Sequence, residues 1–210
     1  DFDGDGRQDL LLGVGNTSFV FEMGTDPGDL SSLMSAWKAP DEHWAAKAEN
    51  VTGDSLPELF FRSDKRYLIY QNTGNNSYEQ IASLANYTEG QNTPGVPRIE
   101  IGDFDDDGQI EFLMADTDGD IYAYELVEEE FVPTWSTRLS QVDAVDFITT
   151  GDLDGNGIPE IIAGCHSDVS LSDEVNSEAR HWSFTVFRKG GDDSYIPAAN
   201  WSFSPFQTLE

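Results

Sequence analysis

The stretch Asp103-Phe104-Asp105-Asp106-Asp107-Gly108-Gln109-Ile110-Glu111 decides the fold of this chain. Acidic side chains recur at alternate positions, a glycine permits a sharp reversal, and a further acid stands directly before the apolar run Phe112–Met114. Oxygen ligands at this spacing suit Ca²⁺, a hard cation that takes about six to eight oxygens. Because the apolar run follows at once, the pattern predicts a metal-binding loop that leads into a β-strand.

The same pattern occurs four times, which makes internal repetition the strongest signal in the sequence. We name the copies loop one (1–9), loop two (50–58), loop three (103–111) and loop four (152–160). Their first residues lie 49, 53 and 49 positions apart. A period near 50 without a helical pattern predicts the blades of a β-propeller.

The flanks of the loops repeat as well. Strands are expected before the last three loops, at Trp44–Ala48, Arg98–Ile101 and Val145–Thr149, and a short apolar strand follows every loop. Alternating strands come next, at Phe19–Phe21, Tyr67–Tyr70, Ile121–Tyr124 and Phe184–Phe187. A fourth strand carries Trp37, Trp135 or Trp201 in three repeats and Ile81–Leu84 in the second.

The predicted fold is therefore all-β, with four-stranded antiparallel blades, and the first blade lacks its opening strand. The repeats span about 1–40, 41–93, 94–142 and 143–206 of one partial propeller, 1–210. One segment offers an alternative: Asp29 before Leu30, Leu33 and Met34 also fits a capped helix up to Trp37. The repeat favours a loop and an outer strand there.

Loops one, three and four each supply a full set of oxygen ligands, in which the fourth member is a backbone carbonyl. Without a cation these carboxylates would repel one another at close range, so we expect about three Ca²⁺ ions. The expected ligands are Asp1, Asp3, Asp5, Arg7 and Asp9; Asp103, Asp105, Asp107, Gln109 and Glu111; and Asp152, Asp154, Asn156, Ile158 and Glu160.

Loop two is degenerate. It offers Asn50, Thr52, Asp54 and Glu58, but Ser55 replaces the glycine, so we expect it to be weak or empty. An EF-hand is the rival reading of all four loops. It needs a glutamate at position 12 and flanking helices, and these loops offer neither.

Composition narrows the possible partners. The chain has 11 Lys and Arg against 40 Asp and Glu, a net charge of −29, which disfavours nucleic acid and anionic membranes. No stretch reaches the length of a membrane span. Sequons for N-glycosylation weakly favour a secreted or cell-surface location, and they lie at Asn16, Asn50, Asn75, Asn86 and Asn200.

The segments Gly102-Asp103-Phe104-Asp105-Asp106-Asp107-Gly108 and Gly151-Asp152-Leu153-Asp154-Gly155-Asn156-Gly157 resemble the FG-GAP repeat of integrin α-subunit propellers and related secreted proteins. The resemblance spans nearly the whole chain. It implies four-stranded blades around an axis, with calcium between the first and second strands of a blade. The family usually closes with seven blades, sometimes six or eight, so the resemblance implies a fragment of a larger propeller. A closed four-bladed ring that uses Phe206–Glu210 as the missing strand is the alternative.

Two functions remain open. The first is an extracellular calcium-binding module that recognises protein or glycan, alongside other blades or domains of the same polypeptide. The second is the propeller of a secreted polysaccharide lyase, but the basic residues are few and scattered, which favours binding without catalysis. Asp116–Asp120 fits either a catalytic carboxylate cluster or a hairpin turn, and the short polar turns of repeats one and two favour the turn.

The turn between the second and third strands is long only in repeat four, at Ser167–Arg180. Connections of this length are usually functional or disordered. Its acidic residues favour a basic partner or a bridging cation. The candidates for partner binding are Asp168, Asp173, Glu174 and Glu178.

Overall fold

The computed structural model describes the chain except for residues 27, 91–98, 140–144, 146, 169–179 and 204–210. Its described part consists of antiparallel sheets, and it divides into two compact units, residues 1–85 and 86–210. Each unit contains two sheets and is described by itself. No helix in the described part is long and apolar enough to cross a membrane.

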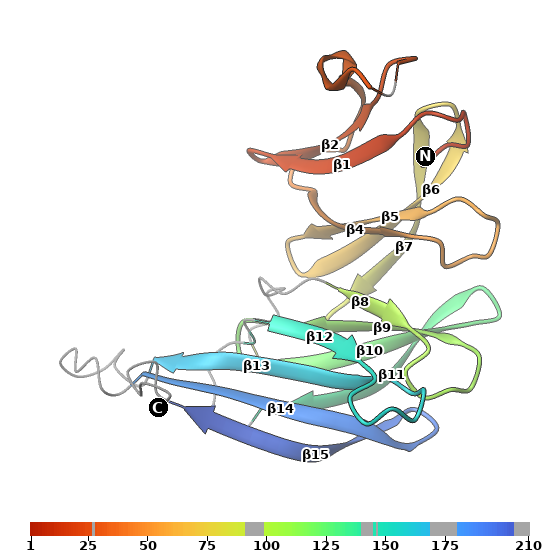
Figure 1. The fold of residues 1–210 in the computed structure, drawn as a ribbon. Coiled ribbons are helices and arrows are strands. Elements are labelled where there is room, and N and C mark those ends of the chain that lie inside the picture. Colours follow the sequence, from red (N-terminus) through yellow and green to blue (C-terminus); the bar gives the residue numbers. More distant parts are fainter. Residues whose placement is uncertain (27, 91–98, 140–144, 146, 169–179, 204–210) are drawn as a thin grey trace. The chain divides into compact units, whose positions relative to one another are not determined.

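The first unit holds the first two repeats. Blade one has three strands in the order β1-β2-β3: β1 (Asp9–Val14), β2 (Thr17–Glu22) and β3 (Met34–Lys38). Blade two has the order β4-β5-β6-β7: β4 (Trp44–Glu49), β5 (Glu58–Ser63), β6 (Arg66–Gly74) and β7 (Ser77–Ala85) (Figure 1). The first blade is thus one strand short in the described chain, as predicted.

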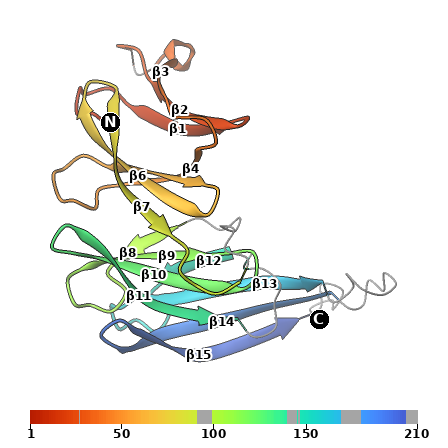
Figure 2. The same ribbon diagram turned by 180° about the vertical axis from the view of Figure 1, so that it is seen from behind.

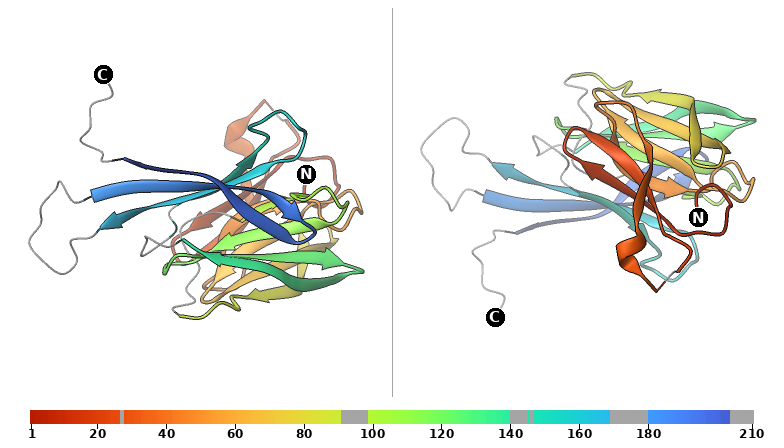
Figure 3. Two further views of the ribbon diagram at one scale, coloured as in Figure 1. Left: turned by 90° about the horizontal axis from the view of Figure 1, so that it is seen from below. Right: turned by 90° about the horizontal axis from the view of Figure 1, so that it is seen from above.

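The second unit holds the last two repeats (Figure 2). Blade three contains β8 (Glu100–Gly102), β9 (Ile110–Ala115), β10 (Asp120–Val127) and β11 (Glu130–Arg138). Blade four contains β12 (Phe147–Gly151), β13 (Glu160–Asp168), β14 (Arg180–Gly191) and β15 (Ser194–Phe203), whose long strands run side by side in Figure 3. In both blades, strands that follow one another in sequence are neighbours in the sheet. The predicted four-stranded antiparallel blade is confirmed.

The segment 29–37, for which the sequence allows either a capped helix or a loop and an outer strand, contains one short helical turn followed by a strand. Asp29 caps a single 3₁₀ turn, η1 (Leu30–Ser32), and its carboxylate accepts a hydrogen bond from the Ser31 backbone N–H. Strand β3 begins two residues later. The predicted cap at Asp29 is therefore present, but the chain forms only one helical turn because the following residues pair with β2.

Each unit has its own core, formed where its two sheets pack face to face. In the first unit, Trp37 of β3 contacts Tyr78 of blade two, with ring centroids 5.0 Å apart. In the second, Trp135 of β11 contacts Tyr195 of blade four at 5.1 Å. The two contacts have the same edge-on geometry, so each unit repeats one packing arrangement.

Both tryptophans lie at a register shift in the fourth strand. Trp37 pairs with Val20 just before the shift, and Trp135 lies between the pairs Tyr122–Ser136 and Tyr124–Pro133. Trp201 lies elsewhere: it pairs with Phe184 and stacks on it at 5.0 Å. All three tryptophans thus lie in the fourth strand of their repeats, as predicted. The sequence does not show where the bulge falls, so it could not tell that Trp201 packs differently from the other two.

Candidate metal centres

Loop three brings its four predicted acids together. Asp103, Asp105, Asp107 and Glu111 each offer a carboxylate oxygen, and these oxygens lie within 4.8 Å of one another. The backbone winds around Asp103, which accepts hydrogen bonds from the N–H groups of Asp106 (2.6 Å) and Gly108 (3.0 Å). Gly108 adopts a φ of 91°, a left-handed conformation in which a residue with a Cβ would be strained.

Asp105 supplies the sharpest indication of a ligand. It is 1% exposed, and Oδ1 has no hydrogen-bond partner among the described residues. Burial raises its pKa, and it also raises the pKa of Glu111, to about 8, with Asp105 and Asp103 adding repulsion. Buried charges are normally paired or bind a metal. Four carboxylates around a buried oxygen that lacks a donor fit a hard divalent cation such as Ca²⁺.

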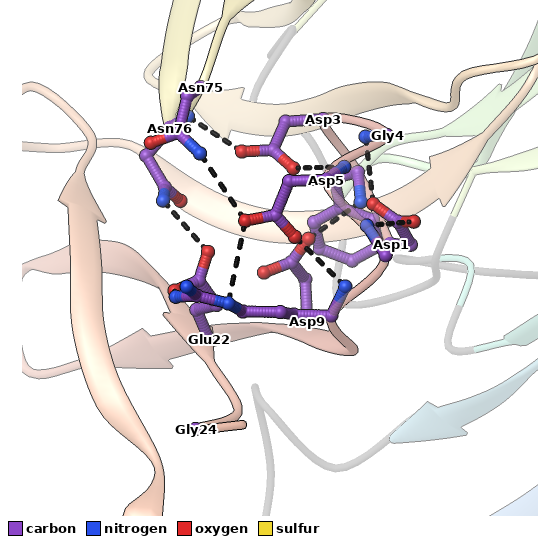
Figure 4. Close-up of polar contacts among 12 residues, drawn as sticks. Asp1, Asp3, Gly4, Asp5, Asp9, Glu22, Gly24, Asn75 and Asn76 are labelled. Carbon is purple, nitrogen blue, oxygen red and sulfur yellow. Dashed lines mark hydrogen bonds and ion pairs between the residues drawn. The ribbon is translucent and has the colours of Figure 1, made fainter. Parts of the chain in front are cut away.

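Loop one has the same winding. Asp1, Asp3 and Asp5 form the acidic group, and Asp1 accepts hydrogen bonds from the N–H groups of Gly4 and Gly6. Asp9, the first residue of β1, accepts a hydrogen bond from the Phe2 N–H at 2.6 Å through Oδ2, while its buried Oδ1 has no hydrogen-bond partner in the described chain (Figure 4). Burial raises the pKa of Asp9.

Loop four brings together Asp152, Asp154 and Glu160, and Asp152 accepts hydrogen bonds from the N–H groups of Gly155 and Gly157. Asn156 completes the ring of predicted side chains, and its Oδ1 accepts a hydrogen bond from the Ile158 N–H at 2.7 Å. The same bond occurs in the other two loops, where Asp5 accepts from Arg7 and Asp107 from Gln109, each at 2.8 Å. The three carbonyl ligands, of Arg7, Gln109 and Ile158, stay predictions.

Loop two differs at its last acid, because protein donors occupy both of its carboxylate oxygens. Both oxygens of Glu58 accept hydrogen bonds, from the Val51 N–H at 2.9 Å and from the Thr52 hydroxyl at 2.9 Å. Asp54 accepts from the Leu56 N–H and from the side chain of Gln71, and Asn50 accepts from the Gly53 N–H. Ser55 takes the left-handed place of the glycine, with a φ of 80°. These contacts agree with a weak or empty loop.

Sequence reasoning missed a second group of residues at the loops, which comes from the following blade. The turn between the third and fourth strands, here called the hairpin tip, reaches back to the loop of the preceding blade. Asn76 donates its backbone N–H to Asp3 Oδ2 at 2.7 Å (Figure 4). Asp193 donates its own to Asp105 Oδ2 at 2.8 Å. A signal was available, because the tips read Asn75-Asn76-Ser77-Tyr78 and Asp192-Asp193-Ser194-Tyr195.

Asp116–Asp120 is a hairpin turn between β9 and β10, as favoured above. The buried Asp116 accepts hydrogen bonds from the backbone N–H groups of Asp118 (3.1 Å) and Asp120 (2.9 Å), and from the Asn86 side chain (2.7 Å). Arg138 lies 3.7 Å from Asp118 and 3.9 Å from Asp120. The turn is thus held by its own acids, although these acids also lie close enough to share a metal ion.

Among the sequons, Asn16, Asn50, Asn75 and Asn200 are exposed, whereas Asn86 is 8% exposed. The predicted partner candidates Asp173, Glu174 and Glu178 lie outside the described residues. Asp168 ends β13, where it pairs with Arg180, and its side chain lies outside the described part too.

A model of the FG-GAP-like repeat matches residues 50–114 and 103–163, more than half of the chain. The chain belongs to the FG-GAP-like repeat family. Among the solved structures it is similar to the V. cholerae biofilm matrix protein Bap1, at 17% identity and a TM-score of 0.46 over 96% of this chain and 37% of that one. It is also similar to a structure of S. cerevisiae Dbp5 bound to Nup159, Gle1, IP6 and ADP, at 12% identity and a TM-score of 0.45, over 90% of this chain and 46% of that one.

No curated protein matches the sequence. The chain spans less than half the length of each of the two matched chains named above.

Proposed function

We propose that this chain is an extracellular, calcium-dependent β-propeller module that binds a protein or glycan ligand and does not catalyse a reaction. Ca²⁺ would be held in loops one, three and four by the carboxylates described above, with Asn156 in loop four. When bound, it would neutralise the acidic groups and lock each loop against the start of its strand. The observation that carries this proposal is the buried Asp105, which lies in a group with three further carboxylates and whose Oδ1 has no hydrogen-bond donor in the described chain.

The basic side chains support a binding module over a lyase. An enzyme that holds an acidic polysaccharide needs cationic groups that are free to contact it. Of the eleven basic residues, Arg7, Lys38, Lys47 and Arg138 each lie within 4 Å of a carboxylate of the chain itself, whereas Arg188 is exposed. Such pairs leave an acidic surface, which favours a basic protein ligand or one bridged by a cation.

Metal counting tests the proposal. The chelated protein would be titrated with Ca²⁺ in a calorimeter, and Tb³⁺ luminescence would follow the same sites through neighbouring tyrosines. Three ions are expected. A count of zero or one ion would contradict the proposed calcium binding. Ligand binding that persists in chelator would show that binding does not depend on calcium.

A further inference from the structure

The hairpin tips dock in the same way in both units. Asn76 and Asp193 adopt left-handed backbone conformations, with φ of 49° and 51°. Each donates its backbone N–H to the second aspartate of the preceding loop, Asp3 or Asp105, at 2.7 and 2.8 Å. Because these contacts join residues 73 and 88 positions apart, their recurrence indicates a common docking arrangement and not a local turn preference.

We call the surface of the receiving blade that contacts the hairpin tip the dock. Besides the loop aspartate, it includes a residue of strand β2 in blade one or β10 in blade three. Glu22 pairs with Asp9, and Glu125 pairs with Glu111, so both glutamates stand beside the last acid of a loop. Both are buried, and Glu22 accepts a hydrogen bond from the Asn76 side chain at 3.0 Å. In blade one the dock is therefore formed by a loop aspartate and by the residue beside the loop's last acid, and Glu125 takes the same register position in blade three.

Blade four carries a counterpart of this dock with the opposite charge. Phe187 pairs with Ile161, so Arg188 lies beside Glu160, in the place of Glu22 and Glu125. Arg188 is exposed. Loop four is also less covered than loop three. Leu153 is 60% exposed, whereas its equivalent in loop three, Phe104, is 2% exposed.

A pocket of about 320 Å³ lies at this place. Loop four contributes one wall and the hairpin of blade four the other. The lining residues are Asp154, Asn156, Ile158, Glu160, Arg188, Lys189, Gly190 and Ile196. Asp154 corresponds to Asp3 and Asp105, the aspartates that accept the hairpin N–H in blades one and three. Both contact points of the dock therefore lie on one pocket.

We propose that this pocket binds the acidic tip of the third-to-fourth-strand hairpin of a further FG-GAP-like blade. Asp154 would accept the N–H of the left-handed tip residue, and Arg188 would pair with a carboxylate of that tip. The acid is expected because Arg188 stands in the place of the carboxylate that the amide Asn76 contacts in blade one, and Lys189 lines the same pocket. Leu153 would be covered by the incoming hairpin. This inference rests on the proposed function only in that the chain is a propeller module, since the contacts proposed for Asp154 and Arg188 do not require Ca²⁺ in loop four.

A peptide probe tests the dock on the whole 210-residue chain. The probe is a disulfide-cyclised hairpin with the sequence of residues 187–198, whose tip is Asp192-Asp193-Ser194-Tyr195. The peptide would be added in the presence of Ca²⁺ to a concentration of up to several millimolar. Its binding would be followed by the chemical shifts of the chain's backbone amides. Shifts are expected at Gly155, Gly157 and Arg188, with none at Gly108, because the chain's own Asp193 already contacts loop three.

Charge reversal supplies the control. Arg188→Glu should weaken the peptide about tenfold, and a peptide with Asp192→Lys and Asp193→Lys should regain affinity for that variant alone. Absence of shifts in loop four, or binding that ignores the tip charge, would overturn the proposal. So would self-association of the chain that Arg188→Glu abolishes, because a second copy would then be the occupant. Tb³⁺ luminescence on the same samples separates the outcomes: loaded loops without peptide shifts refute the dock alone, and peptide shifts with empty loops refute the calcium function alone.

Discussion

The backbone nitrogen of Asp193 lies 2.8 Å from Oδ2 of Asp105, and this hydrogen bond joins the hairpin tip of blade four to loop three. Two residues further along, the Tyr195 hydroxyl donates a hydrogen bond to Glu111 Oε2 at 3.3 Å. Two of the four acids of loop three are thus positioned by the next blade. Metal binding in the loop and packing between the two sheets should therefore depend on each other.

Tyr195→Phe tests this dependence. The substitution removes the bond to Glu111 but keeps the ring against Trp135, so we expect a loss of about 1 kcal/mol in the free energy of unfolding. The Tb³⁺ affinity of loop three should fall as well. Tyr78→Phe is the matched control, because Tyr78 packs on Trp37 in the same way but its hydroxyl makes no such bond in the described chain. Equal effects of the two substitutions would contradict the role of the hydroxyl.

Asp105→Asn tests the metal site of loop three. The amide keeps an oxygen for the Asp193 N–H and removes a buried charge, so the calcium-free protein should be as stable as the unaltered chain or more so. In Ca²⁺ at ten times the dissociation constant, the variant should lack about 1.4 kcal/mol of stabilisation. Thermal unfolding with and without chelator measures both. Asp54→Asn in loop two should change neither quantity, and a loss there would show that loop two also binds.

The calcium-free protein should lose stability as pH rises from about 4.5 to about 8. Burial raises the pKa of Glu111 to about 8 and that of Glu125 to about 7, where Asp193, Asp107 and Asp105 add repulsion. The folded state thus binds more protons than the unfolded one in this window. The contribution is full below the unfolded pKa, near 4.5, and disappears as pH passes the folded values.

Unfolding temperatures at pH 5 and pH 8 in chelator measure this effect, and a drop of roughly 5 °C is expected. Glu125→Gln should reduce the drop, since the amide does not titrate. Ca²⁺ should oppose the trend, because it requires the ionised carboxylates and so stabilises most at pH 8. A calcium-free protein that gains stability between pH 5 and 8 would contradict the burial of these two acids.

Asn86 should be the poorest glycan acceptor of the five sequons. Its side-chain nitrogen, the atom that a glycan would occupy, donates a hydrogen bond to Asp116 at 2.7 Å. Expression through a secretory pathway and mass spectrometry of glycopeptides should find Asn16 or Asn200 occupied more than Asn86. High occupancy at Asn86 would show that glycans are added before this contact forms.

The same contact predicts a stability effect. Asn86→Asp replaces the donor with a second carboxylate against the buried Asp116, so we expect a loss of about 2 kcal/mol near pH 7. The pKa of Asp116 is already raised to about 6 by burial, so acidification below 6 should reduce the loss. Asn200→Asp, at an exposed position, is the control and should be neutral.

Local patterns in the sequence were enough to predict the loops, the strands that follow them and the repeat of blades. Ligand spacing, the glycine at Gly108 and alternating apolar residues act over a few neighbouring positions, so they can be read directly. The degenerate state of loop two was also visible, because Ser55 and the missing acids are local changes.

How one blade completes the loop of another could not be predicted, because it depends on contacts between blades that form only in the folded chain. The contacts of Asn76 with Asp3 and of Asp193 with Asp105 join residues far apart in the chain, and a local pattern carries no information about such distances. The different packing of Trp135 and Trp201 could not be predicted either, because it depends on where a β-bulge shifts the register by one residue in each strand. Which acids are buried follows from these packing contacts, because burial depends on what the neighbouring sheet covers.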